Sequence, residues 1–218
     1  MKRFLITLFI IYGILSVVFA QTKKSFTLGF DIGATASNEI YPFKVAYADE
    51  STAFGSSGPA PSVLGLNVGV LGEYYFSSRW SIKGALIYYQ KGSGNIFLSR
   101  TTTSGNSYHL NYLEVPIMAG FHFGATRNWY INWGIYGGFL SSTSQPTNAD
   151  GNARDAFTAT DYGLSAGIGI KFPLHNKIKL FIEYDGQLGF RDVLKNSPGD
   201  SPSNISQSIN AGLNFAIK

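Results

Sequence analysis

The stretch YLEVPIMAGFHF, residues 112–123, decides the fold because its charge and its proline stand on one side of a regular alternation. The apolar residues Leu113, Val115, Ile117, Ala119, Phe121 and Phe123 share one face, opposite Glu114, Pro116 and His122. Alternation with period two predicts a β-strand with two different faces. A one-residue slip would move Glu114 to the other face of the sheet, so its position is informative.

The same alternation recurs along the chain and predicts eight strands. They span residues 25–37, 63–76, 80–90, 112–123, 129–141, 161–172, 178–190 and 204–218. The charged and histidine side chains in these stretches all stand opposite the apolar set: Asp31, Glu73, Lys83, Glu114, His122, Lys171, Lys179, Glu183 and Asp185. Each strand therefore has one apolar face and one polar face.

The connections between the predicted strands alternate in length. Long polar segments cover 38–62, 91–107, 142–160 and 191–203, and tight turns cover 77–79, 124–128 and 173–177. An even number of strands with long connections at one end and short ones at the other is typical of outer-membrane barrels. We therefore predict an all-β fold, an eight-stranded antiparallel up-and-down transmembrane β-barrel, with both termini in the periplasm.

Alternation alone leaves open which face points outward, since a soluble lipocalin-like barrel or a sandwich would turn its apolar face inward. Trp80, Trp129 and Trp133 lie on the apolar face and are too bulky for the lumen of an eight-stranded barrel. The polar face is rich in glycine, which suits a crowded lumen. Aromatic residues near the strand ends predict two interfacial girdles. They are Tyr74, Trp80, Phe123, Trp129 and Phe172 at the short-turn end, and Tyr88, Tyr162 and Phe190 at the other.

The N-terminus has the features of a secretory signal peptide. Lys2 and Arg3 precede an apolar stretch over residues 4–19, which ends in Val18-Phe19-Ala20. The stretch is slightly short for a membrane-spanning helix, which needs about 20 residues and would be the alternative interpretation. We expect residues 1–20 to be a signal peptide and residues 21–218 to form one barrel domain. The chain has no cysteine, which excludes disulfides and thiolate metal sites.

The composition narrows the choice of partners. The chain is 44% hydrophobic and 14% charged, against about 25% charged for ordinary soluble domains. It has no basic patch interleaved with aromatic residues, so we expect no nucleic-acid partner.

Three segments, NYLEVPIMAGFHF, WYINWGIYGGF and DYGLSAGIGIKF, resemble the PorT-like family of small outer-membrane β-barrels. The distinctive part is the Tyr112–Pro116 motif. The resemblance implies an eight-stranded barrel in the outer membrane of a Gram-negative bacterium, and the family's named member is linked to protein secretion. The implied partners are outer-membrane lipid and lipopolysaccharide, the barrel-assembly machinery, and secretion-system or extracellular proteins. The chain departs from the usual terminal aromatic of such barrels, because Ala216, Ile217 and Lys218 follow Phe215.

The charges of the polar face form the main candidate site. We expect a polar network in the lumen made of Asp31, Glu73, Lys83, Glu114, Lys171, Lys179, Glu183 and Asp185. Buried charges must pair. The first tight turn places Glu73 opposite Lys83. The turn at 173–177 places Lys171 opposite Lys179, and this repulsive pair needs an acid nearby, such as Glu114, Glu183 or Asp185. The network is interpreted as a structural plug or, alternatively, as a selective path for ions or protons.

Other chemistry has weaker support in the sequence. His109 and Asp161 could form a dyad at the rim, as in barrel hydrolases, but no nucleophile elbow accompanies them. The segment NADGNARDAF, residues 148–157, lacks the glycine and the glutamate of a calcium loop. We expect no metal, no cofactor and no enzymatic activity. The predicted function is action through the long extracellular segments or as a secretion or assembly accessory. A narrow solute pore and a rim hydrolase are the alternatives.

Overall fold

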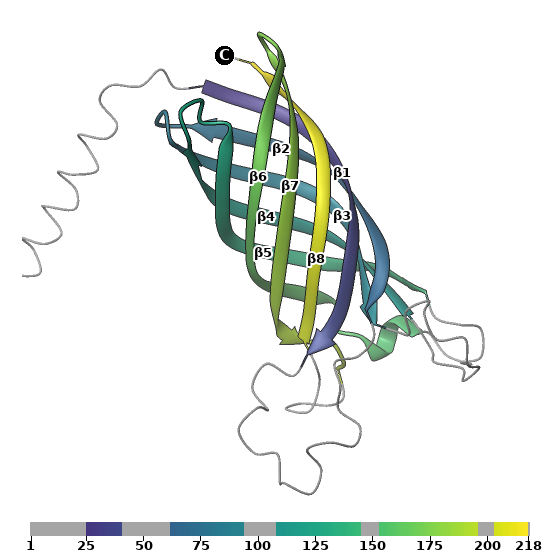
Figure 1. Cartoon of the computed structure of the whole chain (residues 1–218). Helices are drawn as coiled ribbons and strands as arrows, with labels where there is room; N and C mark the ends of the chain where they lie inside the picture. The colour runs from purple at the N-terminus through teal and green to yellow at the C-terminus, as the bar shows by residue number, and fades with distance from the viewer. Residues whose placement is uncertain (1–24, 41–61, 94–107, 145–152, 196–202, 218) are drawn as a thin grey trace, which may run out of the picture.

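The computed structural model describes residues 25–40, 62–93, 108–144, 153–195 and 203–217. The predicted signal peptide over residues 1–20 lies outside these ranges, and so do most of the long connecting segments. The described chain forms eight strands and one short 3-10 helix (Figure 1). They are β1 Ser25–Ile40, β2 Val63–Tyr75, β3 Trp80–Ser93, β4 Tyr108–Phe123, β5 Trp129–Ser144, η1 Ala153–Ala156, β6 Thr160–His175, β7 Ile178–Asp192 and β8 Ser203–Ala216.

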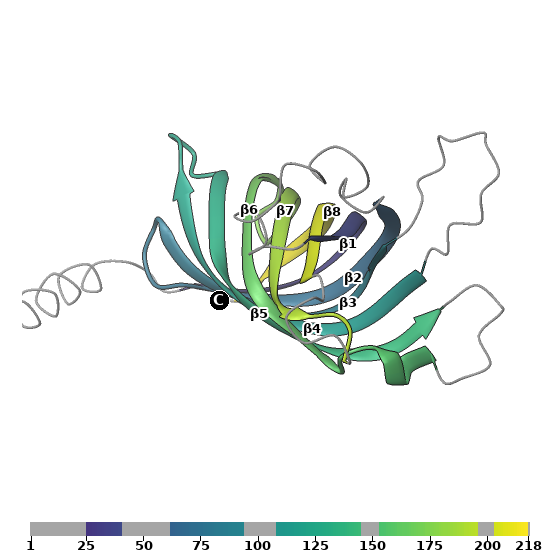
Figure 2. The same ribbon diagram turned by 90° about the horizontal axis from the view of Figure 1, so that it is seen from below.

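The strands form a closed barrel in chain order, and each pairs antiparallel with its neighbours. Strands β1 and β8 close the barrel, with pairs that run from Thr27 with Ala216 to Ile40 with Ser203. Figure 2 shows the strands arranged around one axis. This confirms the predicted all-β, eight-stranded antiparallel barrel. Among the described residues, no helix is long and apolar enough to cross a membrane.

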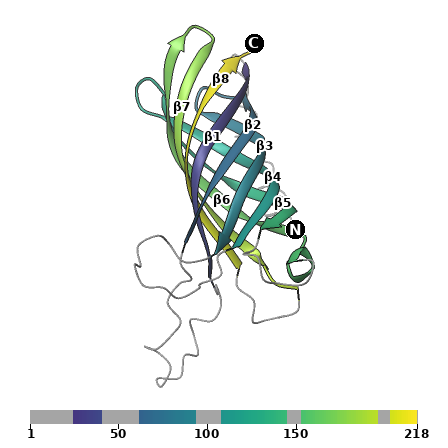
Figure 3. The same cartoon turned by 90° about the vertical axis from the view of Figure 1, so that its right-hand side faces the viewer.

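The two ends of the barrel differ. We name the end that carries the turns 76–79, 124–128 and 176–177 the short-turn end, and the opposite one the long-segment end. The β6–β7 hairpin stands beyond the neighbouring strands at the short-turn end (Figures 1 and 3). The turn between β4 and β5 contains Gly124 at φ 83° and Arg127 at φ 55°, both in the left-handed region that favours glycine.

The strand boundaries agree closely with the predictions at the short-turn end, with one exception. The tight turn predicted at 173–177 is wrong, because β6 continues through Pro173 to His175 and only residues 176–177 connect it to β7. At the long-segment end β1, β3 and β5 run three residues further than predicted, to Ile40, Ser93 and Ser144, and β4 begins four residues earlier, at Tyr108. Polar side chains on both faces there remove the alternation on which the prediction depends.

The apolar face points outward, as predicted. Its large side chains are exposed, from Phe26 at 37% to Leu64 at 69%. The alternation of exposed and buried residues follows the strands, as in β2 and β4. Of the predicted girdle residues, those that are exposed are Tyr74, Tyr88, Trp129, Tyr162, Phe172 and Phe190. Trp80 and Phe123 are half-buried, because their rings pack around Phe121.

Pro116 interrupts one hydrogen-bond ladder of the wall. Pairing between β3 and β4 stops at Gly84 with Ile117 and resumes at Ile87 with Glu114, in the same register. Proline has no N–H to donate, which accounts for the gap. The side chain of Pro116 is buried, so the residue lies on the lumen side beside Glu114.

A small apolar cluster lies at the long-segment end of the barrel. It consists of the buried residues Leu110, Tyr112, Leu140, Phe157 and Val193, with Tyr108 and Leu194 packed against it. Helix η1 precedes Phe157, and Arg154 Nη2 donates a hydrogen bond of 2.9 Å to the carbonyl of Leu140. The cluster connects β4 and β5 to the segment between β5 and β6, which contains η1 and Phe157.

Candidate functional site in the barrel lumen

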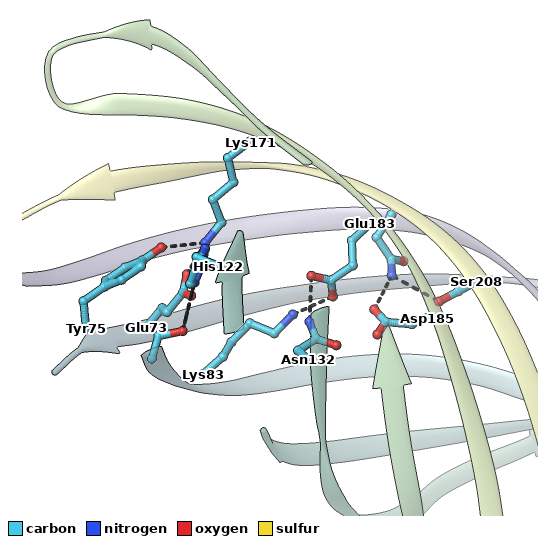
Figure 4. Close-up of polar contacts among 11 residues, drawn as sticks. Glu73, Tyr75, Lys83, His122, Asn132, Lys171, Glu183, Asp185 and Ser208 are labelled. Atoms are coloured by element: carbon cyan, nitrogen blue, oxygen red, sulfur yellow. Dashed lines mark hydrogen bonds and ion pairs between the residues drawn. The ribbon is translucent and has the colours of Figure 1, made fainter. Parts of the chain in front are cut away.

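The structure brings the predicted polar residues into the lumen, with one exception. The buried ones are Asp31, Glu73, Lys83, Glu114, Lys171, Glu183 and Asp185. Lys179 is exposed. The seven buried residues come from β1, β2, β3, β4, β6 and β7, so charges from strands that are not neighbours in the sheet lie close together inside the barrel. Figure 4 shows part of this arrangement.

The predicted pairing of Lys171 with Lys179 is wrong. Lys171 pairs with Phe181 across β6 and β7, and Lys179 pairs with Pro173. Because β6 continues through Pro173, the register moves by two positions, with a shift between Pro173 and His175. The movement by two keeps every side chain on its face but carries Lys179 out to the mouth of the barrel, where it lines the opening.

The first part of the network lies near the short-turn end and is centred on Glu73. Its Oε2 lies 2.5 Å from Lys171 Nζ. Its Oε1 accepts a hydrogen bond of 2.7 Å from Ser81 Oγ and lies 3.1 Å from His122 Nε2. Lys171 Nζ also donates to Tyr75 Oη at 2.6 Å (Figure 4). The acid that satisfies Lys171 is thus Glu73 and not one of the three acids proposed from the sequence.

The second part lies at mid-height and joins β3 to β7. Lys83 Nζ lies 2.5 Å from Glu183 Oε1, and Asn132 Nδ2 donates to Glu183 Oε2 at 3.0 Å (Figure 4). The register of Glu73 opposite Lys83 is confirmed, but the two side chains choose partners across the lumen. Next to them, Asp185 Oδ2 accepts a hydrogen bond of 3.0 Å from Asn210 Nδ2.

The third part lies toward the long-segment end and is centred on Lys91, which the sequence analysis missed. Lys91 Nζ lies 2.6 Å from Glu114 Oε1 and 3.1 Å from Asp161 Oδ2, and its side chain is 0% exposed. It also stands over the ring of Tyr136 at 4.3 Å from the centroid, with Tyr89 and Tyr112 further out. Lys91 was assigned to a connecting segment. Lys91 lies eight residues after Lys83, and this even spacing along β3 puts both side chains on the lumen face. The spacing is the signal from which its position could have been predicted.

Neutral donors complete the third part. Gln187 Nε2 donates to Glu114 Oε2 at 3.1 Å. Asp161 Oδ2 accepts hydrogen bonds from Tyr136 Oη at 3.2 Å and from Asn204 Nδ2 at 3.1 Å. These contacts explain how a charged residue is tolerated in an otherwise apolar strand. The carboxylate of Glu114 faces the lumen, where the Lys91 ammonium and the Gln187 amide stabilise it.

The dyad of His109 and Asp161 is not assembled. Asp161 is buried and directs its carboxylate to Lys91, Tyr136 and Asn204. His109 stands in the wall opposite Gly92 and Ser144. Within the described ranges, no group of three or more His, Asp or Glu side chains is arranged to hold a metal ion.

The lumen holds larger side chains than the sequence analysis expected. Beside the glycines it contains the buried rings of Tyr89, Tyr112, Tyr130, Tyr136 and Phe181. The two observations agree, because the glycines make room for these rings. A Cβ atom on Gly169 would lie 2.4 Å from the hydroxyl of Tyr130, and one on Gly212 would lie 2.5 Å from Cζ of Phe181.

Little free space remains at mid-height. A cavity of about 20 Å³ is bordered by Asp31, Lys83, Glu183 and Asp185. That is room for about one water molecule. With most of its charges paired and its rings packed against glycines, the network can hold the strands together and close the lumen. Most of its carboxylates have lysine, amide or hydroxyl partners, whereas Asp31 Oδ1 is buried without a hydrogen-bond partner among the described residues.

Ser81 Oγ lies 3.1 Å from His122 Nε2, but Glu73 Oε1 contacts that same nitrogen. The three side chains therefore lack the arrangement of a catalytic triad, in which the acid binds the other ring nitrogen.

Comparisons with known proteins agree with this architecture. Among curated proteins, none matches the sequence. Among solved structures, the chain is similar to Neisserial surface protein A, with 13% identity and a TM-score of 0.50 over 89% of this chain and 99% of that one. It is also similar to the outer membrane protein OprG from Pseudomonas aeruginosa, with 13% identity and a TM-score of 0.52 over 88% of this chain and 96% of that one. At such identities the likeness concerns the fold alone.

The family is shown by a sequence model. The model described as "Outer membrane protein beta-barrel domain" matches residues 19–195, which is most of the chain. This match agrees with the closed eight-stranded barrel and its exposed apolar band, and it implies an outer-membrane location. The chain therefore belongs to the family of outer membrane protein β-barrel domains.

Proposed function

We propose that this protein is a non-enzymatic, non-conducting outer-membrane barrel that acts through its two ends. The observation that carries the proposal is the filled lumen. Ion pairs cross it at three heights, centred on Glu73, Glu183 and Lys91, and a cavity of only about 20 Å³ lies at mid-height. A solute would have to separate these buried pairs, which leaves charges without a partner inside the barrel and is strongly unfavourable.

The orientation is part of the proposal. The short-turn end and both termini face the periplasm, and the long segments face the exterior. The support is the asymmetry of the connections, since bacterial barrels have short periplasmic turns and longer external loops. A signal peptide over residues 1–20 would supply the export that this requires.

The partners follow from the surfaces. The exposed apolar band contacts lipid and lipopolysaccharide, and the barrel-assembly machinery inserts the chain. The resemblance to PorT-like barrels supports a role as a secretion or assembly accessory. Alternate residues of the motif that carries the resemblance face the lumen: Tyr112 and Glu114 contact Lys91, and Pro116 is buried beside them, while Leu113 and Val115 point outward. The motif therefore builds the plug, and contact with other proteins is left to the ends.

Planar-bilayer recording tests the closed lumen. The purified barrel is expected to give no discrete conductance steps, while a porin added to the same membrane provides the positive control. Reproducible steps from the barrel alone would contradict the proposal and favour the narrow pore.

Protease treatment of intact cells tests the orientation. Cleavage is expected within the segments 41–61, 94–107, 145–152 and 196–202. Cleavage in the turn 124–128 of intact cells would reverse the orientation. Cleavage there after the outer membrane is opened would agree with it.

A further inference from the structure

The short-turn end of the barrel contains a vestibule that the filled lumen does not use. Its volume is about 440 Å³, far more than a single water needs. It lies among the turns at this end and is bordered on one side by the β6–β7 hairpin, which stands beyond its neighbours (Figure 3). Lys171, His122 and Tyr75 of the Glu73 network line its inner part.

The charges that line the vestibule are all of one sign. Arg127, Lys177 and Lys179 lie around the opening and are exposed. They form no ion pair within the described part of the chain. Lys171, deeper inside, is neutralised by Glu73. No aspartate or glutamate is among the lining residues. Three cations around one concave opening raise the local concentration of anions.

Neutral polar groups stand beside these cations. Thr27 Oγ1 and Asn214 Oδ1 line the same vestibule and are buried, without a hydrogen-bond partner in the described ranges. Asn214 is only 4% exposed. Buried polar atoms normally have a partner, so a pair of unpartnered ones in a cavity wall points to a polar ligand. Thr27 Oγ1 can donate a hydrogen bond to a carboxylate oxygen whose charge the cations neutralise, and Asn214 Oδ1 can accept a hydrogen bond from a peptide N–H.

We propose that the vestibule binds an acidic peptide segment that enters the barrel from the short-turn side, with its carboxylates against Arg127, Lys177 and Lys179. Arg127 lies in the turn between β4 and β5, Lys177 in the turn between β6 and β7, and Lys179 at the start of β7. A chain with several carboxylates can therefore place one against each cation. A lipid headgroup is disfavoured, because the vestibule opens along the barrel axis and the lipid surrounds the outer wall. This inference rests on the proposed function for its setting, since the short-turn end must face the periplasm for a periplasmic protein to supply the segment.

An NMR titration of the isotope-labelled full-length barrel in uncharged detergent tests the site. The probe is an oligoglutamate peptide with blocked ends, and oligoglutamine of the same length is the neutral comparison. Oligoglutamate is expected to shift the amide signals of Arg127, Lys177 and Lys179 and to leave Lys195, at the long-segment end, unchanged. Oligoglutamine is expected to shift none of them. Binding should weaken as salt is added, because the contacts are exposed.

Two matched variants remove charge at the same end of the barrel. The double variant Lys177→Gln/Lys179→Gln is expected to weaken binding of oligoglutamate at least about tenfold, as expected for the loss of two charge-assisted contacts. Arg79→Gln removes an exposed cation from the first short turn, outside the vestibule, and should leave the affinity unchanged. All three positions are exposed, so the fold is preserved.

Three results would overturn the inference. They are the absence of binding, an equal loss in Arg79→Gln and in the double variant, and binding of inorganic phosphate as tight as that of oligoglutamate. The assay uses purified protein and has no dependence on insertion or conductance. A barrel that does not bind oligoglutamate would therefore contradict the peptide site and not the closed lumen. A barrel that conducts would contradict the closed lumen and not the peptide site.

Discussion

Two buried lysines, one near each end of the lumen, have similar partners and different surroundings. Lys91 lies between two carboxylates, Glu114 and Asp161, under the apolar cluster of the long-segment end. Lys171 has one carboxylate, Glu73, which it shares with His122, and it borders the open vestibule. Tyrosine rings stand against both ammonium groups. A lysine paired with a carboxylate and a tyrosine ring can therefore help to close one end of the barrel and line the mouth of the other. The difference lies in the residues that surround each pair.

The largest effect is expected at the covered end. Lys91→Met leaves Glu114 and Asp161 buried without their cation. Removing one partner of a buried ion pair costs about 3–5 kcal/mol. The free energy of unfolding, measured with urea in detergent micelles or bilayers, should fall by that amount. The triple variant with Glu114→Gln and Asp161→Asn should recover most of the loss, since no charge is left unpaired. A Lys91→Met barrel as stable as wild type would mean that this end is not sealed.

A smaller effect is expected at the open end. Glu73→Gln removes the carboxylate from Lys171 and His122. Lys171 is buried but borders the vestibule, so a small movement of its side chain brings the ammonium group to water. The expected loss is about 1–3 kcal/mol, as for an unsatisfied polar group, measured by the same urea titration. The comparison would collapse if Glu73→Gln cost as much as Lys91→Met.

The apolar cover itself depends on a modest contact. Arg154→Ala removes the hydrogen bond from the guanidinium to the carbonyl of Leu140. The expected loss is about 0.5–1.5 kcal/mol, the usual contribution of one hydrogen bond. Hydrogen exchange at the amides around Leu140 and Phe157 should quicken, while exchange around Glu73 at the other end stays unchanged. Faster exchange at both ends would show that the two regions are coupled.

The smallest energetic effect accompanies a test of the two faces. The chain has no cysteine, so single cysteines can be placed at neighbouring positions of β6. Leu164, which is 49% exposed, points outward, and Ser165 is buried in the lumen. Leu164→Cys should react with a lipid-soluble thiol reagent, and Ser165→Cys should not. The reverse pattern would mean that the faces are assigned backwards.

The strands and their faces could be predicted because the two sides of the wall meet different surroundings. The alternation in residues 112–123 therefore assigns Glu114 to the lumen face without any knowledge of its contacts. Register followed wherever a turn was truly tight, as for Glu73 and Lys83. The predicted register is wrong between β6 and β7, because Pro173 lies inside β6 and the predicted strand ends at Phe172.

The partners inside the lumen could not be predicted in the same way. Lys83 of β3 pairs with Glu183 of β7, and Lys171 of β6 pairs with Glu73 of β2. These pairs cross the lumen between strands that are not neighbours in the sheet. Sequence periodicity determines the face of a residue, whereas the choice of partner depends on the height of each side chain after closure. The vestibule, which depends on the length of the β6–β7 hairpin, was missed for the same reason.

The seam between β1 and β8 has a consequence for the biogenesis of this protein. It joins β1 to β8, so it can form only after the residues of β8 have been synthesised. Until then β1 presents an unpaired edge, which hydrocarbon cannot satisfy. A chain that stalls before Ser203 is an open sheet with two free edges, ready to pair with other unfinished chains. Closure of the barrel therefore depends on β8, and loss of this strand would prevent the whole barrel from forming.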